Sequence, residues 1–269
     1  MNNNFVFHTN EMLLLAKEVF NNNPFLTEET GAINVKGDRS IAMDVKIEKT
    51  FIDYIKKNNL PVNIFSEEIG ALNFHSSPKF LVAFDPLDGS TNYKIGKNLF
   101  PFGTLIAFYK GVESKLENII AAGALEFTRD LAWLYDGKKT TDLKGNKVLL
   151  KENWKIQKST PIYLDLYYKE GYEKYSPLAQ KISIRNTGST IGNLSYLLSN
   201  VAAGVGGVCV RAEEVGAIYS LIKGAGGVAV NHEGQDLGKE SFSPEKTYPI
   251  LAGCRNIVEF CLKQIKEDK

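Results

Sequence analysis

Apolar residues near the start of the chain recur with helical spacing. Residues 9–20 predict a first helix, which Thr9 or Asn10 can cap. Its apolar side is formed by Leu13, Leu14, Ala16 and Phe20. Residues 44–58 predict a second helix, whose apolar side is formed by Ile47, Phe51 and Ile55. Each helix therefore has one face that another element has to cover.

Shorter apolar runs after the second helix have the length of strands. Two of them, residues 62–65 and 80–84, end directly in acidic residues. Further strands with turn residues between them are predicted at 104–109, 118–127, 131–135 and 147–150. This half of the chain is thus predicted to form a meander of strands, and helices are expected to cover its sheet.

Strands and helices alternate in the second half of the chain. Helices are predicted at residues 190–203 and 214–223, strands at 207–210 and 227–231, and a last helix around residues 257–265. The polar stretch 151–158 is the expected passage between two lobes. The chain is predicted to form an N-terminal α+β lobe, residues 1–155, and a C-terminal α/β lobe, residues 156–269, in a layered α/β architecture.

Composition excludes several classes of partner. In 269 residues, 32 Lys and Arg balance 31 Asp and Glu, for a net charge of +1, so no global field favours nucleic acid or an anionic membrane. The three cysteines, Cys209, Cys254 and Cys261, form no CxxC pair, which argues against a zinc site or a disulfide framework. The start of the chain lacks the pattern of a secretory signal. A cytoplasmic location is expected.

Candidate chemistry concentrates where strands end. Asp85 follows a buried strand, and Asp88 lies across a turn that Pro86 and Gly89 favour. Glu67 ends another predicted strand, and Glu214 opens a predicted helix. Carboxylates brought together repel one another unless cations compensate them. Because His and Cys are absent from these motifs, the oxygen ligands indicate Mg²⁺ first and Mn²⁺ second.

The turn after Asp88 can also bind an anion. If Ser90 begins a helical turn, the backbone N–H groups of Gly89 and Ser90 point outward, and Gly89 allows close approach of a phosphate oxygen. Each motif alone has an ordinary structural explanation, since Asp-Gly is usually only a turn and a helix N-terminus favours acidic residues. Their joint occurrence indicates phosphate-ester hydrolysis.

These residues resemble the motifs of the inositol monophosphatase superfamily, which includes inositol monophosphatases, archaeal-type fructose-1,6-bisphosphatases and bisphosphate nucleotidases. Residues 85–92, Asp-Pro-Leu-Asp-Gly-Ser-Thr-Asn, resemble its DP(I/L)DG(T/S)xN box. Residues 66–68, the helix with Asp44 and Glu48, residues 187–190 and residues 225–227 also fit. The resemblance covers about Lys36 to Gly227 and implies an α-β-α-β-α sugar-phosphatase sandwich.

The resemblance implies two or three Mg²⁺ ions. Its implied metal ligands are Glu67, Asp85, the Leu87 carbonyl, Asp88 and Glu214. It implies that Asp44 and Ser90 activate the attacking water, and that Gly89 and Ser90 bind phosphate. Lys36, Gly37 and Asp38 resemble a mobile loop near a third ion.

Two departures from the family pattern stand out. Glu213-Glu214 replaces the family's Trp-Asp, so that the metal-binding aspartate becomes the longer glutamate. Gly207 stands where inositol-specific members have a carboxylate, seven residues before that ligand. The second departure argues against strict inositol specificity.

The leading hypothesis is a Mg²⁺-dependent phosphatase that hydrolyses a small sugar-phosphate monoester, fructose-1,6-bisphosphate or inositol-1-phosphate, by metal-activated water. Candidate substrate contacts are Arg185, Ser189 and Arg211. A bisphosphate nucleotidase or NADP phosphatase is an alternative, and a non-catalytic regulatory protein on the same scaffold is another. The resemblance also implies a homodimer.

Overall fold

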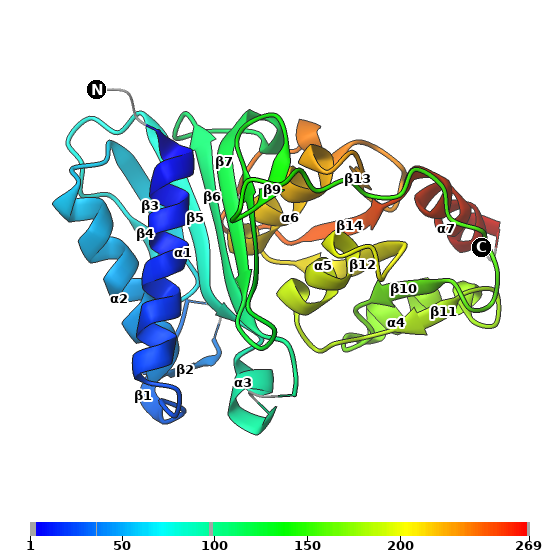
Figure 1. The fold of residues 1–269 in the computed structure, drawn as a ribbon, viewed down its shortest axis with the longest axis horizontal. Helices are drawn as coiled ribbons and strands as arrows, with labels where there is room; N and C mark the ends of the chain where they lie inside the picture. Colours follow the sequence, from blue (N-terminus) through cyan, green and yellow to red (C-terminus); the bar gives the residue numbers. More distant parts are fainter. Residues whose placement is uncertain (1–3, 36, 97–98, 268–269) are drawn as a thin grey trace.

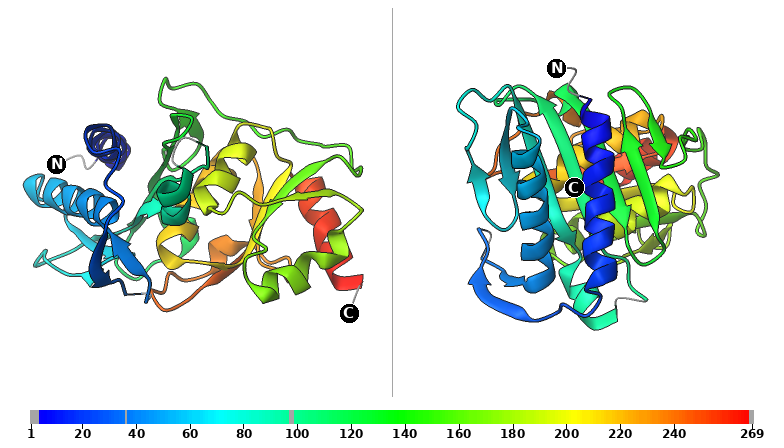
Figure 2. Two further views of the ribbon diagram at one scale, coloured as in Figure 1. Left: turned by 90° about the horizontal axis from the view of Figure 1, so that it is seen from below. Right: turned by 60° about the vertical axis from the view of Figure 1, so that its left-hand side comes forward.

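Helices and sheets alternate in five layers (Figure 1; Figure 2, left). The computed structural model describes residues 4–35, 37–96 and 99–267. The first layer holds α1 (Phe5–Asn22) and α2 (Ala42–Lys57), the middle layer α5 (Thr190–Leu198) and α6 (Ala212–Gly224), and the last layer α4 (Lys169–Tyr175) and α7 (Arg255–Glu267). Two sheets separate these helical layers, which confirms the predicted layered α/β sandwich.

The larger sheet has seven strands in the order β4-β3-β5-β6-β7-β8-β9. Their bounds are Gly70–Leu72, Val62–Ser66, Phe80–Asp88, Gly103–Lys110, Ile119–Glu126, Leu131–Tyr135 and Thr140–Asp142. The β3–β5 pair is parallel and the other pairs are antiparallel. Parallel pairing places the ends of β3 and β5 at the same edge of the sheet, which brings Glu67 near Asp85.

Strand β5 is apolar from Phe80 to Phe84 because both faces of its sheet are covered. Val82 and Phe84 pack in one hydrophobic cluster with residues of α1 and α2. Leu81 and Ala83 point the other way, into the cluster that contains the buried residues of α5 and α6. The alternation fixes the register of β5, and with it the position of the carboxylates at its end.

The smaller sheet has the order β11-β10-β12-β14-β13. Its strands span Ser183–Arg185, Pro161–Leu164, Gly204–Val210, Tyr248–Gly253 and Val228–Val230. Strand β10 is parallel to both of its neighbours, whereas β14 is antiparallel to β12 and β13. A separate hairpin of β1 (Glu29–Ile33) and β2 (Arg39–Ile41) leads into α2.

Several element boundaries differ from the predictions. Helix α1 begins at Phe5, because the side chain of Asn4 accepts a hydrogen bond from the Phe7 N–H at 3.2 Å. Helix α5 ends at Leu198, and Asn200 adopts a positive φ of 56° soon after it. Residues 147–150 form no strand; β9 takes the edge of the sheet, and residue 147 makes a single bridge to it.

Some elements have no counterpart in the sequence-based prediction. These are the hairpin β1–β2, helix α4 and strands β4, β9, β11 and β14. Short helix α3 (Ser90–Gly96) begins where a helical turn was expected to start. In the described part of the chain, no helix combines the length and the apolar character that a membrane crossing requires. The lobe boundary at residue 155 stays a prediction.

Candidate active site

A pocket of about 670 Å³ lies where β3, β5, α2, α3, α5 and α6 meet. Its lining includes the predicted residues Asp44, Glu67, Asp85, Leu87, Asp88, Gly89, Ser90, Ser189, Arg211 and Glu214. These residues come from stretches of the chain that are up to 170 positions apart, 44 to 214. The tertiary fold therefore brings the ends of the strands and the first turns of the helices together around one pocket.

Three carboxylates form the centre of this pocket. Oxygen atoms of Asp85, Asp88 and Glu214 all lie within 4.8 Å of one another. Only 2% of Asp85, 8% of Asp88 and 6% of Glu214 is exposed. Three buried carboxylates this close repel one another strongly unless a cation joins them. The oxygen-only donor set fits a hard divalent ion.

The backbone holds Asp85 in place. Its Oδ1 accepts a hydrogen bond from the Leu87 N–H at 2.9 Å, and its carbonyl accepts one from the Thr104 hydroxyl at 2.9 Å. Strand β5 runs on past the predicted end at residue 84 to Asp88, with a register shift against β6 between Asp85 and Asp88. Such a bulge re-aims side chains, and here both carboxylates face the pocket.

Helix starts position the other two carboxylates. Oδ2 of Asp88 accepts a hydrogen bond from the Ile191 N–H at 2.5 Å, in the first turn of α5. Glu214 lies in the first turn of α6, and its Oε2 accepts a hydrogen bond from the Thr190 hydroxyl at 2.9 Å. Both helix N-termini favour negative charge, which partly offsets the repulsion.

Burial and mutual repulsion raise the pKa of every carboxyl in this cluster. Burial first, and then the charges of Glu67 and Asp88, raise the pKa of Asp85 well above its usual range. Burial raises the pKa of Asp88 to about 6, against the opposing effect of the Ile191 N–H. The pKa of Glu214 is also raised well above its usual range, first by burial and then by Asp88. A bound cation would reverse these shifts.

Glu67 and Arg211 connect the cluster to the β1–β2 hairpin. Arg211 pairs through Nη1 with Glu67 Oε1, and its Nη2 lies 2.6 Å from Asp38 Oδ2. Burial raises the pKa of Glu67 to about 7, although Arg211 opposes the rise. Arg211 is thus engaged with two carboxylates. Lys36, part of the predicted mobile loop, lies outside the described residues.

Asp44 stands beside the cluster on α2. It is 3% exposed, and its Oδ2 accepts a hydrogen bond from the Ile41 N–H at 3.4 Å. Its Oδ1 is buried and has no hydrogen-bond partner among the residues that the structure describes. Burial, followed by the charges of Glu67 and Glu68, raises the pKa of Asp44 well above its usual range. Ser90, at the first position of α3, lines the same pocket.

Gly89 turns the chain between Asp88 and α3 with a φ of +80°. A Cβ at this position would lie 2.7 Å from the Ser189 Cβ and 3.3 Å from the Pro101 carbonyl oxygen. Glycine is therefore required here twice, for its backbone conformation and for the close approach of the segment that carries Ser189.

Replacing Gly89 with alanine is expected to lower both stability and activity. The positive φ costs about 1–2 kcal/mol for an L-residue, and the added methyl group pushes the start of α3 away from Ser189. We expect kcat/KM to fall at least about tenfold, measured together with Tm. Gly145→Ala is a matched control, because its φ is +84° with nothing within 4 Å of the new Cβ. Equal effects of both substitutions on activity would contradict the prediction.

Two predicted substrate contacts have a different position or role. Arg185, at the end of β11, is exposed and is not among the residues that line the pocket. Ser189 lines the pocket, but its hydroxyl caps α5: it accepts from the Gly192 N–H at 3.0 Å and donates to the Pro101 carbonyl at 2.9 Å. Ser189 therefore orients the helix whose first turn holds Asp88.

The sequence-based prediction missed two residues whose hydrogen bonds hold the elements of the site in place. Asn92 donates two hydrogen bonds of 2.8 Å, to the carbonyls of Pro101 and Thr187, and so ties α3 to the segment before α5. Thr190 holds Glu214, as described above. Asn92 belongs to the motif at 85–92, which was a usable signal, whereas nothing in the sequence marks Thr190 as a partner of Glu214.

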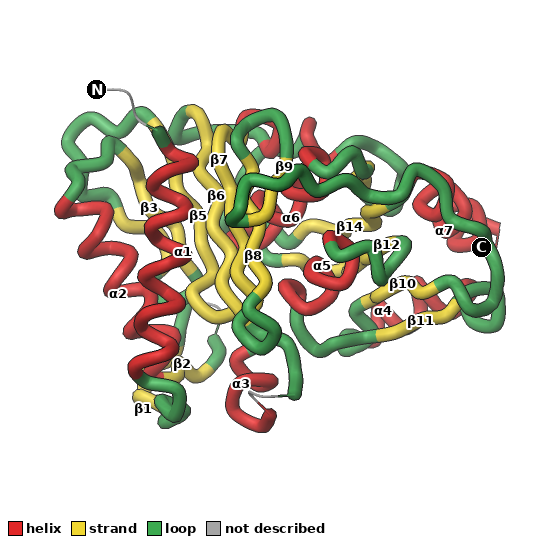
Figure 3. The backbone as a smooth tube through the Cα atoms, in the orientation of Figure 1, coloured by secondary structure: helices red, strands yellow, loops and turns green. Residues whose placement is uncertain are grey.

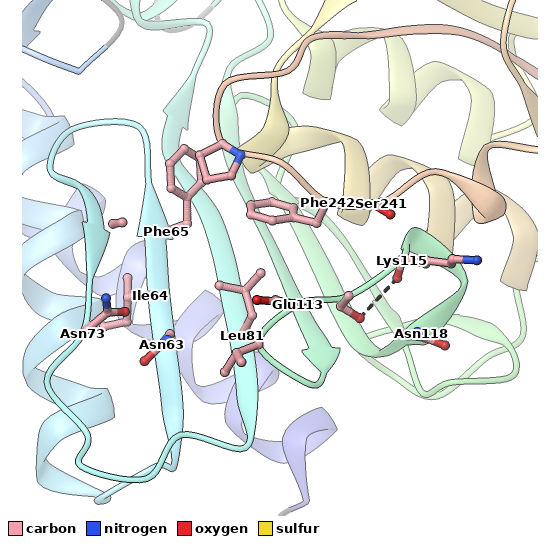
Figure 4. Close-up of a pocket in the computed structure, with 14 residues that line it drawn as sticks. Asn63, Ile64, Phe65, Asn73, Leu81, Glu113, Lys115, Asn118, Ser241 and Phe242 are labelled. Carbon is pink, nitrogen blue, oxygen red and sulfur yellow. Dashed lines mark hydrogen bonds between the residues drawn. The ribbon is translucent and has the colours of Figure 1, made fainter.

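A second depression lies over one face of β3 and β5 (Figure 4). Its volume is about 660 Å³, close to that of the first pocket. Its polar lining consists mainly of amides and hydroxyls, with Glu113 and Lys115 as its charged residues. Because it lacks a group of converging carboxylates, the first pocket is the candidate active site.

Comparisons with known proteins agree with this fold. Residues 18–128 match the family model described as fructose-1-6-bisphosphatase, N-terminal domain. The chain is 24% identical to fructose-1,6-bisphosphatase class 1 of Syntrophotalea carbinolica, over 89% of this chain and 82% of that protein. It is 25% identical to fructose-1,6-bisphosphatase/inositol-1-monophosphatase of Thermococcus kodakarensis, over 89% of this chain and 88% of that protein. A solved structure of an inositol monophosphatase from Anabaena (Nostoc) matches this fold with a TM-score of 0.75 at 20% sequence identity. The match covers 98% of this chain and 95% of that chain.

Its similarity to these named phosphatases assigns the chain to the phosphoric monoester hydrolases. Within that class, the matches to the fructose-1-6-bisphosphatase family model and to the archaeal fructose-1,6-bisphosphatase/inositol-1-monophosphatase support the inositol monophosphatase superfamily.

Proposed function

We propose that this protein is a Mg²⁺-dependent phosphatase that releases phosphate from a small sugar-phosphate monoester, with inositol-1-phosphate and fructose-1,6-bisphosphate as the substrates to test first. The observation that carries the proposal is the group of oxygen atoms from Asp85, Asp88 and Glu214 within 4.8 Å of one another. The names of the relatives support the substrate class.

The ligand assignment follows the donor atoms. Asp85, Asp88 and Glu214 are proposed to hold one ion, and Asp85, Glu67 and the Leu87 carbonyl another. When bound, Mg²⁺ supplies positive charge that polarises the phosphoryl oxygens and offsets their negative charge. Glu67 has to exchange part of its contact with Arg211 for the ion, and Asp38 remains as a partner for the guanidinium.

The residues around the carboxylate cluster are proposed to position the phosphate group and the attacking water. The N–H groups of Gly89 and Ser90 are proposed to hold a phosphate oxygen, while Ser90 and Asp44 orient the attacking water. Water adds to phosphorus, its proton passes toward Asp44, the bond from phosphorus to the sugar oxygen breaks, and the leaving sugar oxygen takes up a proton from solvent. A buried carboxyl with a raised pKa is suited to accept a proton near neutral pH. The products are inorganic phosphate and the free sugar alcohol.

Hydrolysis in ¹⁸O-labelled water tests direct displacement. One solvent oxygen is expected in each released phosphate, with no phosphate bound to Ser90 when the reaction is quenched, because Ser90 activates water and does not attack phosphorus. Mass spectrometry of the phosphate and of the Ser90 peptide measures both. A trapped phosphoserine at position 90 would overturn the mechanism. A panel of sugar phosphates and nucleotides with added Mg²⁺ or Mn²⁺ measures the substrate class.

A further inference from the structure

The part of the pocket away from the carboxylate cluster lies at a change of direction in the smaller sheet. Strands β10 and β12 are parallel neighbours. From the end of β10 the chain continues to α4 in the outer layer, whereas from the end of β12 it continues to α6 in the middle layer (Figure 1). Ligands bind in the crevice that such diverging connections leave at the carboxyl ends of parallel strands.

Asp165 follows β10 directly and lines this crevice. Its Oδ1 accepts a hydrogen bond from the Tyr167 N–H at 2.9 Å, and its own N–H donates to the Gly206 carbonyl at 2.9 Å. No hydrogen bond to a described residue uses its Oδ2. The carboxylate is therefore held in one orientation by the backbone while one of its oxygens stays open to a ligand.

Two glycines of β12 line the crevice beside this carboxylate. Gly206 and Gly207 of β12 lie next to Asp165, and a Cβ at Gly207 would lie 3.8 Å from the Asp165 Cβ and 3.2 Å from the Val210 side chain. Tyr168 lines the same space, and its pKa is raised by burial and, against the effect of Arg211, by the charge of Asp165. Asp165 is thus the nearby acceptor for a hydroxyl group.

The charges in the pocket disfavour a second phosphate at this end. Its described basic residues are Arg39, Lys94 and Arg211. Arg39 and Lys94 both pair with Glu29, and Arg211 pairs with Glu67 and Asp38. A second phosphate in the crevice would therefore face the Asp165 carboxylate without a free cation from these residues, and like charges brought together cost several kcal/mol.

We propose that Asp165 determines substrate specificity: it accepts a hydrogen bond from a hydroxyl at the far end of a sugar or polyol monophosphate and excludes a second phosphate there. This inference rests on the proposed phosphatase function and narrows it. A polyol monophosphate such as inositol-1-phosphate is then preferred over fructose-1,6-bisphosphate. Asp165 takes over the recognition of hydroxyls that the resemblance assigns to a carboxylate at the position of Gly207.

The test compares Asp165→Asn with the wild-type protein on three esters in the presence of Mg²⁺. These are inositol-1-phosphate, fructose-1,6-bisphosphate, and 4-nitrophenyl phosphate, which has no hydroxyl to recognise. Asparagine keeps the oxygen that accepts from Tyr167, so the turn is retained. Asp53→Asn is the matched control, because Asp53 is an exposed partner of Lys49 on α2.

We expect the wild type to prefer inositol-1-phosphate at least about tenfold in kcat/KM. In Asp165→Asn this value falls by about tenfold to a hundredfold, because a charge-assisted hydrogen bond is lost. The value for 4-nitrophenyl phosphate stays within about twofold, and the bisphosphate gains at least about tenfold relative to the monophosphate.

Two results would overturn the inference. One is an equal loss on all three esters, which would make Asp165 structural. The other is a wild-type preference for the bisphosphate that Asp165→Asn leaves unchanged. Failure of the wild type to release phosphate from any of the three esters, with Mg²⁺ or Mn²⁺, would instead overturn the proposed phosphatase function, and the inference with it.

Discussion

Phosphate release by the Asp85→Asn variant is expected to fall at least about 10³-fold while the protein stays folded. Asp85 is the most deeply buried of the three clustered carboxylates and the one proposed to contact both ions. The amide is a poorer ligand for a hard cation than the carboxylate, and the charge that holds the ion is reduced. The loss should appear in kcat/KM for every ester, measured at saturating Mg²⁺.

The same substitution is expected to raise the Tm of the metal-free protein. The Asn oxygen can still accept the hydrogen bond from the Leu87 N–H, while one of three mutually repelling charges disappears. Circular dichroism and thermal unfolding in the presence of EDTA measure both effects. Asp53→Asn serves as the control with unchanged activity. A variant with more than a tenth of the wild-type activity, or an unfolded one, would contradict the assignment of Asp85.

Addition of Mg²⁺ or Mn²⁺ to the metal-free protein is expected to raise Tm by roughly 5–10 °C, and the rise should be larger at pH 8 than at pH 6. An ion that binds the folded state alone stabilises it by mass action. A change of about 1 kcal/mol corresponds to about 2–4 °C in a chain of this size. In addition, the ion removes the repulsion that destabilises the metal-free cluster.

The pH dependence follows from the direction of the pKa shifts. The pKa values of Asp88, about 6, and Glu67, about 7, lie above those of the unfolded chain, so the folded state binds more protons between about pH 4 and pH 7. Stability of the metal-free protein is therefore lost as pH rises through this window. Burial also raises the pKa values of Asp85 and Glu214, so these two carboxyls contribute in the same direction.

Thermal unfolding with EDTA and with added metal, at several pH values from 6 to 8.5, measures this dependence. His232 contributes in the opposite direction, because burial lowers its pKa to about 4 and its contribution is lost as pH falls below about 6.5. The comparison therefore starts at pH 6, and the difference between the two curves at each pH isolates the metal effect. In Asp85→Asn both the metal effect and its pH dependence should shrink. A metal-induced rise in Tm of equal size in wild type and variant would contradict a site at this cluster.

The periodicity of the sequence predicted the elements that carry strong apolar patterns. Helix α2, strands β5, β6 and β8 and helix α6 lie close to their predicted positions, because each has an apolar face that burial selects. Strand β14 and helix α4 were missed. Strand β14 contains Pro249, which argues against a central strand, and α4, Lys169–Tyr175, has only seven residues and few apolar positions. The motif at 85–92 was recognisable because turn, carboxylates and hydroxyl follow one another within eight residues.

Only part of the candidate site could be predicted from local sequence patterns. Residue types and local spacing pointed to Asp85, Asp88, Gly89 and Ser90. The contacts of Arg211 with Asp38 and Glu67, and of Thr190 with Glu214, join segments that are far apart in the chain. Arg185 was chosen for its charge alone, and the register of β11 with β10 leaves it exposed, away from the pocket. The metal and substrate roles of all these residues stay predictions.

By itself, the sequence determined the layered architecture and the oxygen-only, acidic chemistry of this protein, since both follow from local periodicity and residue type. The tertiary structure alone decided which carboxylates meet, how they are oriented and where Asp165 faces the pocket. The physical reason is that distances between side chains depend on strand register and helix packing, which many distant apolar contacts fix together and which no local pattern of residues encodes.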